Sequence, residues 1–148
     1  MRTYRALSVS LAASLAFATN AMAAPAPANE ASRITSQYSD WAGGKSNADA
    51  IVAGLRNGAP ITLVTNGADR SISIAGFTPS ASMSYSGVGS ALSNAQRSLS
   101  RLGISKPTAE QIQAALIGGE ILLPSGASAT VRGSITARGG EPGPVAAR

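Results

Sequence analysis

The strongest structural signals in this chain lie in residues 106–124, KPTAEQIQAALIGGEILLP. Thr108 and Gln111 stand three residues apart, the spacing at which two side chains cap the start of a helix reciprocally. Ile112 and Leu116 follow at the i, i+4 spacing of one helical face, and a pair of glycines then favours the end of the helix. We therefore expect a short helix, followed after the glycines by a brief apolar strand.

A second segment, residues 47–65, has the same pattern at one constant offset. Asn47, Ile51, Leu55, Gly58 and Ile61 correspond to Thr108, Ile112, Leu116, Gly119 and Leu122. Ser46 or Asn47 is expected to cap the first of these helices, and Ile72 and Ile74 alternate with serines as a returning strand. Each segment predicts a helix followed by a β-hairpin. The similarity is explained either by an internal duplication or by chance agreement between two short helices.

The longest helical pattern lies between these two units. Apolar residues keep helical spacing over residues 87–102, which indicates a central helix. Behind the second unit, apolar and polar residues alternate from Ala129 to Arg138, and this predicts a half-buried strand that pairs with residues 121–123. We therefore predict an α+β fold with two helix-plus-β-hairpin units joined by a central helix. Its sheet is expected to be mainly antiparallel, of about four strands, with helices on one face.

The first 23 residues are typical of a secretory signal peptide. Arg2 and Arg5 precede an apolar run over residues 6–18, and Ala21-Met-Ala23 is a cleavage site of small residues. A membrane anchor is the alternative, but it needs about 20 apolar residues, and polar residues interrupt this run. We expect a mature chain that begins at Ala24 and is periplasmic or secreted, without a membrane span.

The mature chain divides into three parts. Residues 24–30, rich in alanine and proline, are expected to be a flexible linker. Residues 31–138 are expected to form a single α+β domain, and residues 139–148 a disordered Gly/Pro tail.

Histidine and cysteine are both absent from the chain. Their absence excludes Ser-His-Asp and Cys-His nucleophiles, imidazole bases and thiolate metal sites. We therefore expect no catalytic residue, no cofactor and no metal. Loss of Arg2 and Arg5 with the signal peptide leaves ten basic against seven acidic residues, a net charge of +3. Because the basic residues are scattered singly, no nucleic-acid partner is expected.

Two of the acidic residues, Asp40 and Glu120, have no obvious structural role. Asp49 and Glu110, by contrast, fall in the first turns of predicted helices, where the helix dipole favours negative charge. Two carboxylates that face one cleft within about 10 Å can hydrolyse a glycosidic bond. A carboxylate-dependent hydrolase of envelope glycans, acting through Asp40 and Glu120, is therefore the enzymatic alternative.

An aromatic stripe begins the predicted domain. Ile34, Tyr38 and Trp41 have helical spacing, which favours a small helix over residues 31–41 that docks its aromatic side chains on the core. The other interpretation makes Trp41, the only tryptophan, the anchor of a contact surface.

A candidate interaction surface combines this stripe with the last predicted strand. Arg132 and Arg138 are expected on the solvated face of that strand, where they bind anions or a partner's acidic groups, or keep the strand from pairing with other chains. The candidate surface therefore comprises Tyr38, Asp40, Trp41, Arg132 and Arg138.

Several motifs are distinctive in combination: Trp41, GLRxG at residues 54–58, FTP at residues 77–79 and PTAEQIQAALxGG at residues 107–119. Together they resemble a group of small exported proteins of Gram-negative bacteria, over most of the mature chain. That group has no assigned activity, so the resemblance implies export and a shared fold and transfers no site residue.

These observations favour a non-enzymatic binding or interaction module outside the cytoplasm. Its expected partner is an envelope protein or glycan. Besides the hydrolase described above, a purely structural component of the envelope is the remaining alternative.

Overall fold

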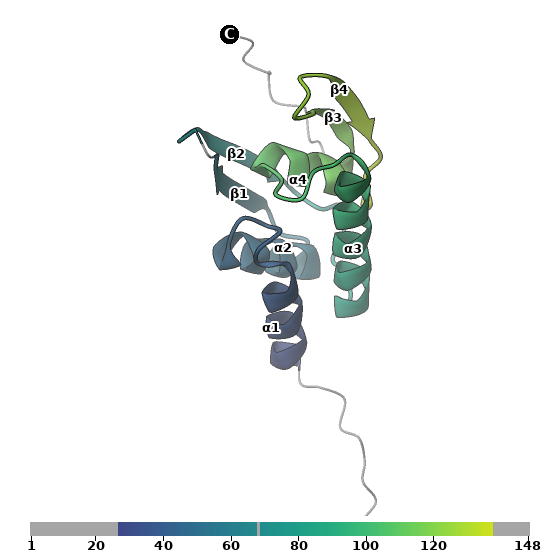
Figure 1. Ribbon diagram of the computed structural model, residues 1–148. Coiled ribbons are helices and arrows are strands. Elements are labelled where there is room, and N and C mark those ends of the chain that lie inside the picture. Colours follow the sequence, from purple (N-terminus) through teal and green to yellow (C-terminus); the bar gives the residue numbers. More distant parts are fainter. Residues whose placement is uncertain (1–26, 68, 138–148) are drawn as a thin grey trace, which may run out of the picture.

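The structure is a computed structural model that describes residues 27–67 and 69–137. Its elements follow the chain in the order α1 (Pro27–Tyr38), α2 (Lys45–Asn57), β1 (Ile61–Asn66), β2 (Ile72–Phe77), α3 (Tyr85–Arg101), α4 (Ala109–Ile117), β3 (Gly119–Leu122) and β4 (Ser128–Val131) (Figure 1). This mixture of helices and antiparallel hairpins confirms the predicted α+β class. The expected signal peptide and Gly/Pro tail lie outside the described residues.

Helix α4 has the capping box expected from its sequence. The Thr108 side chain accepts a hydrogen bond from the Gln111 backbone N–H, and the Gln111 side chain accepts one from the Thr108 N–H at 2.9 Å. The helix ends at Gly118, whose φ of 89° lies in the left-handed region that favours glycine. Ile112 and Leu116 are fully buried, so the predicted apolar face of α4 is the face that meets the core.

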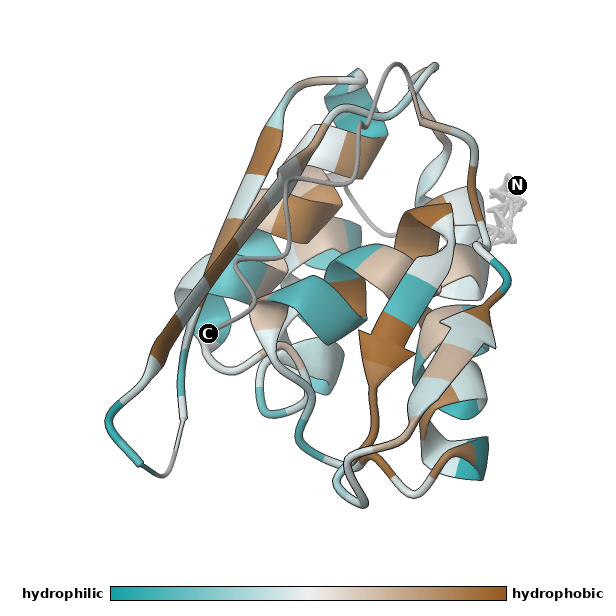
Figure 2. Cartoon of the chain, turned by 90° about the horizontal axis from the view of Figure 1, so that it is seen from above, coloured by the Kyte–Doolittle hydropathy of each residue, from teal (hydrophilic) through white to brown (hydrophobic). Residues whose placement is uncertain are grey.

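The four strands within residues 27–67 and 69–137 form two separate two-stranded sheets, and the expectation of one sheet of about four strands was wrong. β1 pairs with β2 and β3 pairs with β4, both antiparallel. The two sheets do not join because α4 packs against β2 of one hairpin and β3 of the other. Figures 1 and 2 show the two hairpins in different parts of the molecule, with helices between them.

The register of the first hairpin determines which residues meet the core. Ile61 pairs with Phe77 and Leu63 pairs with Ala75, and these four side chains are buried. The alternation predicted for this strand pair is therefore present, but Ile72 and Ile74 lie on the opposite, outward face.

The central helix was predicted correctly. α3 spans Tyr85–Arg101, and its buried residues are Val88, Ala91, Leu92, Ala95 and Leu99. Ser84 caps its start, because its side chain accepts a hydrogen bond from the Gly87 N–H at 3.1 Å.

The N-terminal helix begins earlier than expected. α1 starts at Pro27, so residues 27–30 are helical and do not belong to the linker predicted over residues 24–30. Proline is tolerated there because the first N–H groups of a helix have no partner within it. Glu30 in the first turn also forms an ion pair with Arg33, and this pair raises the pKa of Arg33.

The start of α2 differs from the prediction as well. The helix begins at Lys45 after Gly44, and no side chain caps it. The expected caps, Ser46 and Asn47, therefore lie inside the helix. Lys45 instead forms an ion pair with Asp49 one turn later, and the hydrogen bond from Lys45 lowers the pKa of Asp49.

The last strand is shorter than expected. β4 ends at Val131, although the alternation of apolar and polar residues continues in the sequence to Arg138. The chain leaves the hairpin because Gly133 packs directly on the end of α4, where an added Cβ would lie 2.3 Å from the carbonyl carbon of Ile117. The backbone N–H of Ile135 then donates to the Leu116 carbonyl at 2.8 Å.

Candidate functional site

Two members of the predicted interaction surface are core residues. Tyr38 and Trp41 are only 4% and 5% exposed, and their rings meet edge to face at 6.2 Å between centroids. The docking interpretation of Trp41 therefore holds, and neither aromatic ring can anchor a partner in this structure. The Trp41 indole N–H is buried without a hydrogen-bond partner among the described residues.

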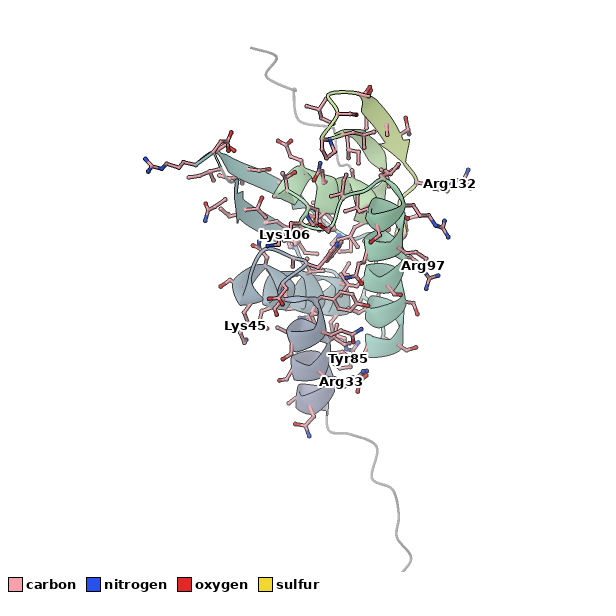
Figure 3. All side chains as sticks on the ribbon, viewed as in Figure 1. Arg33, Lys45, Tyr85, Arg97, Lys106 and Arg132 are labelled. Carbon is pink, nitrogen blue, oxygen red and sulfur yellow. The ribbon has the colours of Figure 1, made fainter. Side chains whose placement is uncertain are left out.

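The two other described members of that surface, Asp40 and Arg132, lie on different parts of the fold. Asp40 is exposed in the turn after α1, and Arg132 is exposed beyond the end of β4. Figure 3 shows Arg132 on the same side of the molecule as Arg97 of α3. Because β4 ends at Val131, Arg132 does not lie on the solvated face of that strand as expected. Arg138 lies outside the described residues.

The acidic residues of the enzymatic alternative are on different elements. Asp40 follows α1, whereas Glu120 lies in β3 of the second hairpin, and both are exposed. One open groove lies between residues 79–83 and residues 133–136, and another lies between residues 103–111 and residues 122–124. Neither Asp40 nor Glu120 lines either groove, so no observation brings the two carboxylates to one cleft.

The first hairpin carries a surface that sequence reasoning missed. Val64, Ile72 and Ile74 are 46%, 65% and 62% exposed on the face turned away from the core. Val64 is paired with Ile74, and Ile72 lies next to Ile74 on the same face, so the three side chains form one apolar patch. We name this patch the outer hairpin face. Its signal in the sequence is that apolar residues occupy both alternations of the strand pair, as expected for a sheet with two apolar faces.

The outer edge of β1 is closed by one side chain. The Asn47 carboxamide of α2 donates to the Val64 carbonyl at 2.8 Å and accepts from the Val64 N–H at 3.1 Å. It also donates to the Ala42 carbonyl at 2.8 Å. Because both outward backbone groups of Val64 have partners, no strand can add to β1 at this point.

The outer edge of β2 is closed at one end only. The Gln113 side chain of α4 donates to the Gly76 carbonyl at 3.2 Å. Further along the chain, Pro79 forms a β-bridge with Ala137, and the Ser80 N–H donates to the Thr136 carbonyl at 3.1 Å. Within the described residues, nothing is hydrogen-bonded to the outward backbone groups of Ile72 and Ile74. We name these two residues the open β2 edge.

The tip of the hairpin is held by Asp69. Its carboxylate accepts hydrogen bonds from the Ser71 hydroxyl and from the Ser71 backbone N–H, the latter at 3.1 Å. These two hydrogen bonds hold the pKa of Asp69 below its ordinary value, and the bond from the Ser71 hydroxyl has the larger effect. Arg70 between them adopts a φ of 67°, and the Gly67 N–H donates to the Ser71 carbonyl at 2.7 Å.

Among residues 27–67 and 69–137, no three acidic, histidine or cysteine residues lie close enough to hold a metal ion. No helix in this part of the chain is both long and apolar enough to span a bilayer. The chain matches no protein family, no curated protein and no solved structure.

Proposed function

We propose that this protein is an exported, non-enzymatic interaction module that binds another polypeptide through the outer hairpin face. The observation that carries the proposal is the exposure of Val64, Ile72 and Ile74 together on one side of a two-stranded sheet. Contiguous apolar patches of this kind are typical of interaction sites, whereas single exposed apolar residues are ordinary.

The composition of the patch favours a polypeptide over a glycan. Sugar sites combine aromatic rings with polar groups, but the outer hairpin face is aliphatic, and Tyr38 and Trp41 are buried. Full burial of an aliphatic side chain contributes about 1.5–3 kcal/mol, so three half-exposed side chains offer about 2–4 kcal/mol to a complex.

Export is supported by the amino-terminal pattern of the sequence. Arg2, Arg5, the apolar run over residues 6–18 and the Ala21-Met-Ala23 site together are typical of a cleaved signal peptide. The resemblance to small exported proteins of Gram-negative bacteria agrees with this location. The module is therefore proposed to work in the periplasm or outside the cell.

Site-specific photo-cross-linking tests the proposed function. A photoreactive residue replaces Val64 in cells that export the protein, and the matched control carries it at Ser90, which is exposed on α3. We expect a cross-linked polypeptide from position 64 only, and we expect Ile72→Ser with Ile74→Ser to abolish it. Absence of any product from position 64, or equal products from both positions, would contradict the proposal.

A further inference from the structure

The exposed side of α3 carries two arginines, and a third lies beside the helix. Arg97 and Arg101 are four residues apart, so they lie on one face of α3, and both are exposed. Arg132 is exposed just beyond the end of β4. We name these three residues the arginine face. We infer that the arginine face binds the phosphate groups of an anionic lipid membrane and holds the protein at the membrane surface.

The fold brings Arg132 to α3, although the two are far apart in the sequence. The hydroxyl of Ser134, two residues after Arg132, donates to the Ala91 carbonyl of α3 at 3.1 Å. Because two residues of chain span at most about 7 Å, the backbone of Arg132 lies close to this helix. Figure 3 shows Arg97 and Arg132 on the same side of the molecule, both pointing outwards. Basic residues that are scattered in the sequence therefore gather on one surface.

No acidic residue forms an ion pair with the arginine face among the described residues. The two ion pairs found there lie within α1 and within α2. The sequence contains no aspartate or glutamate over residues 70–109, which include all of α3. Arg101 also complements the helix dipole from the last turn of α3, but that role does not extend to Arg97 or Arg132. The guanidinium groups are therefore free to bind anions.

The other exposed residues of α3 favour a membrane over a polypeptide. They are uncharged and polar: Ser86, Ser90, Asn94 and Ser100. A protein interface depends on aromatic or aliphatic anchors at its centre, and these residues offer none. Arginine binds phosphate oxygens through paired N–H donors, and an anionic lipid surface presents many phosphates side by side. The short serine side chains let the guanidinium groups reach those phosphates.

Membrane binding through α3 leaves the outer hairpin face accessible. Figure 1 shows the first hairpin and α3 on opposite sides of the molecule. A polypeptide can therefore bind the outer hairpin face while the arginine face is on the membrane. Because the exposed residues of α3 include no apolar side chain, nothing inserts among the acyl chains, and binding depends on charge and is reversible.

Vesicle co-sedimentation of the purified protein tests this inference. The protein should sediment with vesicles that contain phosphatidylglycerol, an anionic lipid, and stay in solution with vesicles of zwitterionic phosphatidylcholine alone. Raising the ionic strength from about 0.01 M to about 0.1 M shortens the screening length from about 30 Å to about 10 Å, and should weaken binding at least about fivefold. Binding that is independent of lipid charge or of salt would overturn the inference.

Two double variants of equal net charge locate the binding surface. Arg97→Gln with Arg132→Gln should weaken vesicle binding at least about tenfold, because each basic residue near an anionic surface strengthens binding roughly fivefold. Lys45→Gln with Arg70→Gln removes two charges from α2 and from the tip of the first hairpin, and should have little effect. All four side chains are exposed, so both variants should keep the urea midpoint of the unaltered protein within a small margin. Equal losses of binding would show that net charge alone attracts the protein, and would overturn the assignment to the arginine face.

Polyglutamate distinguishes an acidic polypeptide from a membrane. Binding to polyglutamate without binding to phosphatidylglycerol vesicles would assign the arginine face to an acidic polypeptide and overturn the membrane inference. This inference goes beyond the proposed function and does not depend on it, because cross-linking from position 64 reports on a different surface. Loss of vesicle binding with cross-linking retained would remove only the membrane inference, and the reverse result would remove only the proposed function.

Discussion

The carboxamide of Asn47 takes the place of a neighbouring β-strand. Its oxygen and nitrogen pair with both outward backbone groups of Val64, as the backbone of an added strand would do. Asn47 is buried although it is polar, because each of these groups finds a partner. A residue expected to cap the start of a helix therefore joins α2 to the first hairpin.

Asn47→Ala should lower the free energy of unfolding by about 1–3 kcal/mol, because it leaves the backbone groups of Val64 and the Ala42 carbonyl without their partner. Asn57→Ala, at the exposed end of α2, is the matched control and should change stability by less than about 0.5 kcal/mol. Urea denaturation of the two variants gives the comparison. Equal transition midpoints would show that the buried carboxamide contributes nothing.

Trp41 is a core residue with one unfavourable feature. Its indole N–H is buried and has no hydrogen-bond partner among the described residues. Trp41→Ala should cost about 3–5 kcal/mol, whereas Trp41→Phe removes the N–H, retains an aromatic ring and should cost less than about 1.5 kcal/mol. Fluorescence of the unaltered protein should be at short wavelength. Emission typical of a solvated indole would contradict the burial of Trp41.

Asp69 should make the hairpin tip sensitive to acid. Its folded pKa lies below the ordinary value of about 3.9. The carboxylate therefore contributes stability to the turn that is present above the ordinary pKa and is lost as the pH falls through the folded pKa. The chemical shift of the Ser71 amide should follow this titration in NMR spectra. The titration should be absent in Asp69→Asn, and an identical shift change in that variant would assign it to another group.

At the scale of elements, α4 connects the two hairpins. It packs against β2 on one side and β3 on the other. The Thr65 hydroxyl of β1 accepts a hydrogen bond from the buried Ala109 N–H at 2.8 Å, which satisfies a donor at the start of α4. The helix therefore depends on the first hairpin for its start and holds the second hairpin at its end.

Leu116→Ala should cost about 2–5 kcal/mol, because Leu116 is fully buried on the core face of α4. Gln113→Ala removes one exposed hydrogen bond to Gly76 and should cost no more than about 1.5 kcal/mol. Urea denaturation curves of the two variants measure the difference. Similar losses would mean that the core face of α4 is assigned incorrectly.

At the scale of the whole molecule, stability has to come from packing. The chain contains no cysteine, so disulfides cannot hold a domain of this size together. The core is mainly aliphatic, with Tyr38, Trp41 and Phe77 as its buried aromatic residues within the described part of the chain. Small cores of this kind give modest stability, so single buried residues matter.

Export should produce a chain that begins at Ala24. Mass spectrometry of the exported protein measures its amino terminus directly. Ala23→Leu should block cleavage because the site requires small residues, whereas Met22→Leu between the two alanines should not. A product that retains Met1 would contradict the signal peptide and the proposed location.

Part of the local structure followed from the sequence alone. The capping box of Thr108 and Gln111, the core face of α4 and the length of α3 depend on residues within a few positions of one another. Those interactions form in the same way wherever the helix lies in the molecule. The α+β class and the two helix-plus-hairpin units follow from the same short-range signals.

Long-range arrangement was decided by the tertiary structure. Strand patterns cannot show which strands join, so the separation of the sheets depends on α4 lying between the hairpins. The predicted interaction surface lost its two aromatic members for the same reason, because the core buries Tyr38 and Trp41, and the packing of Gly133 on α4 ends β4 at Val131. The outer hairpin face is exposed because helices cover only one side of the first sheet, and that coverage depends on residues far apart in the chain.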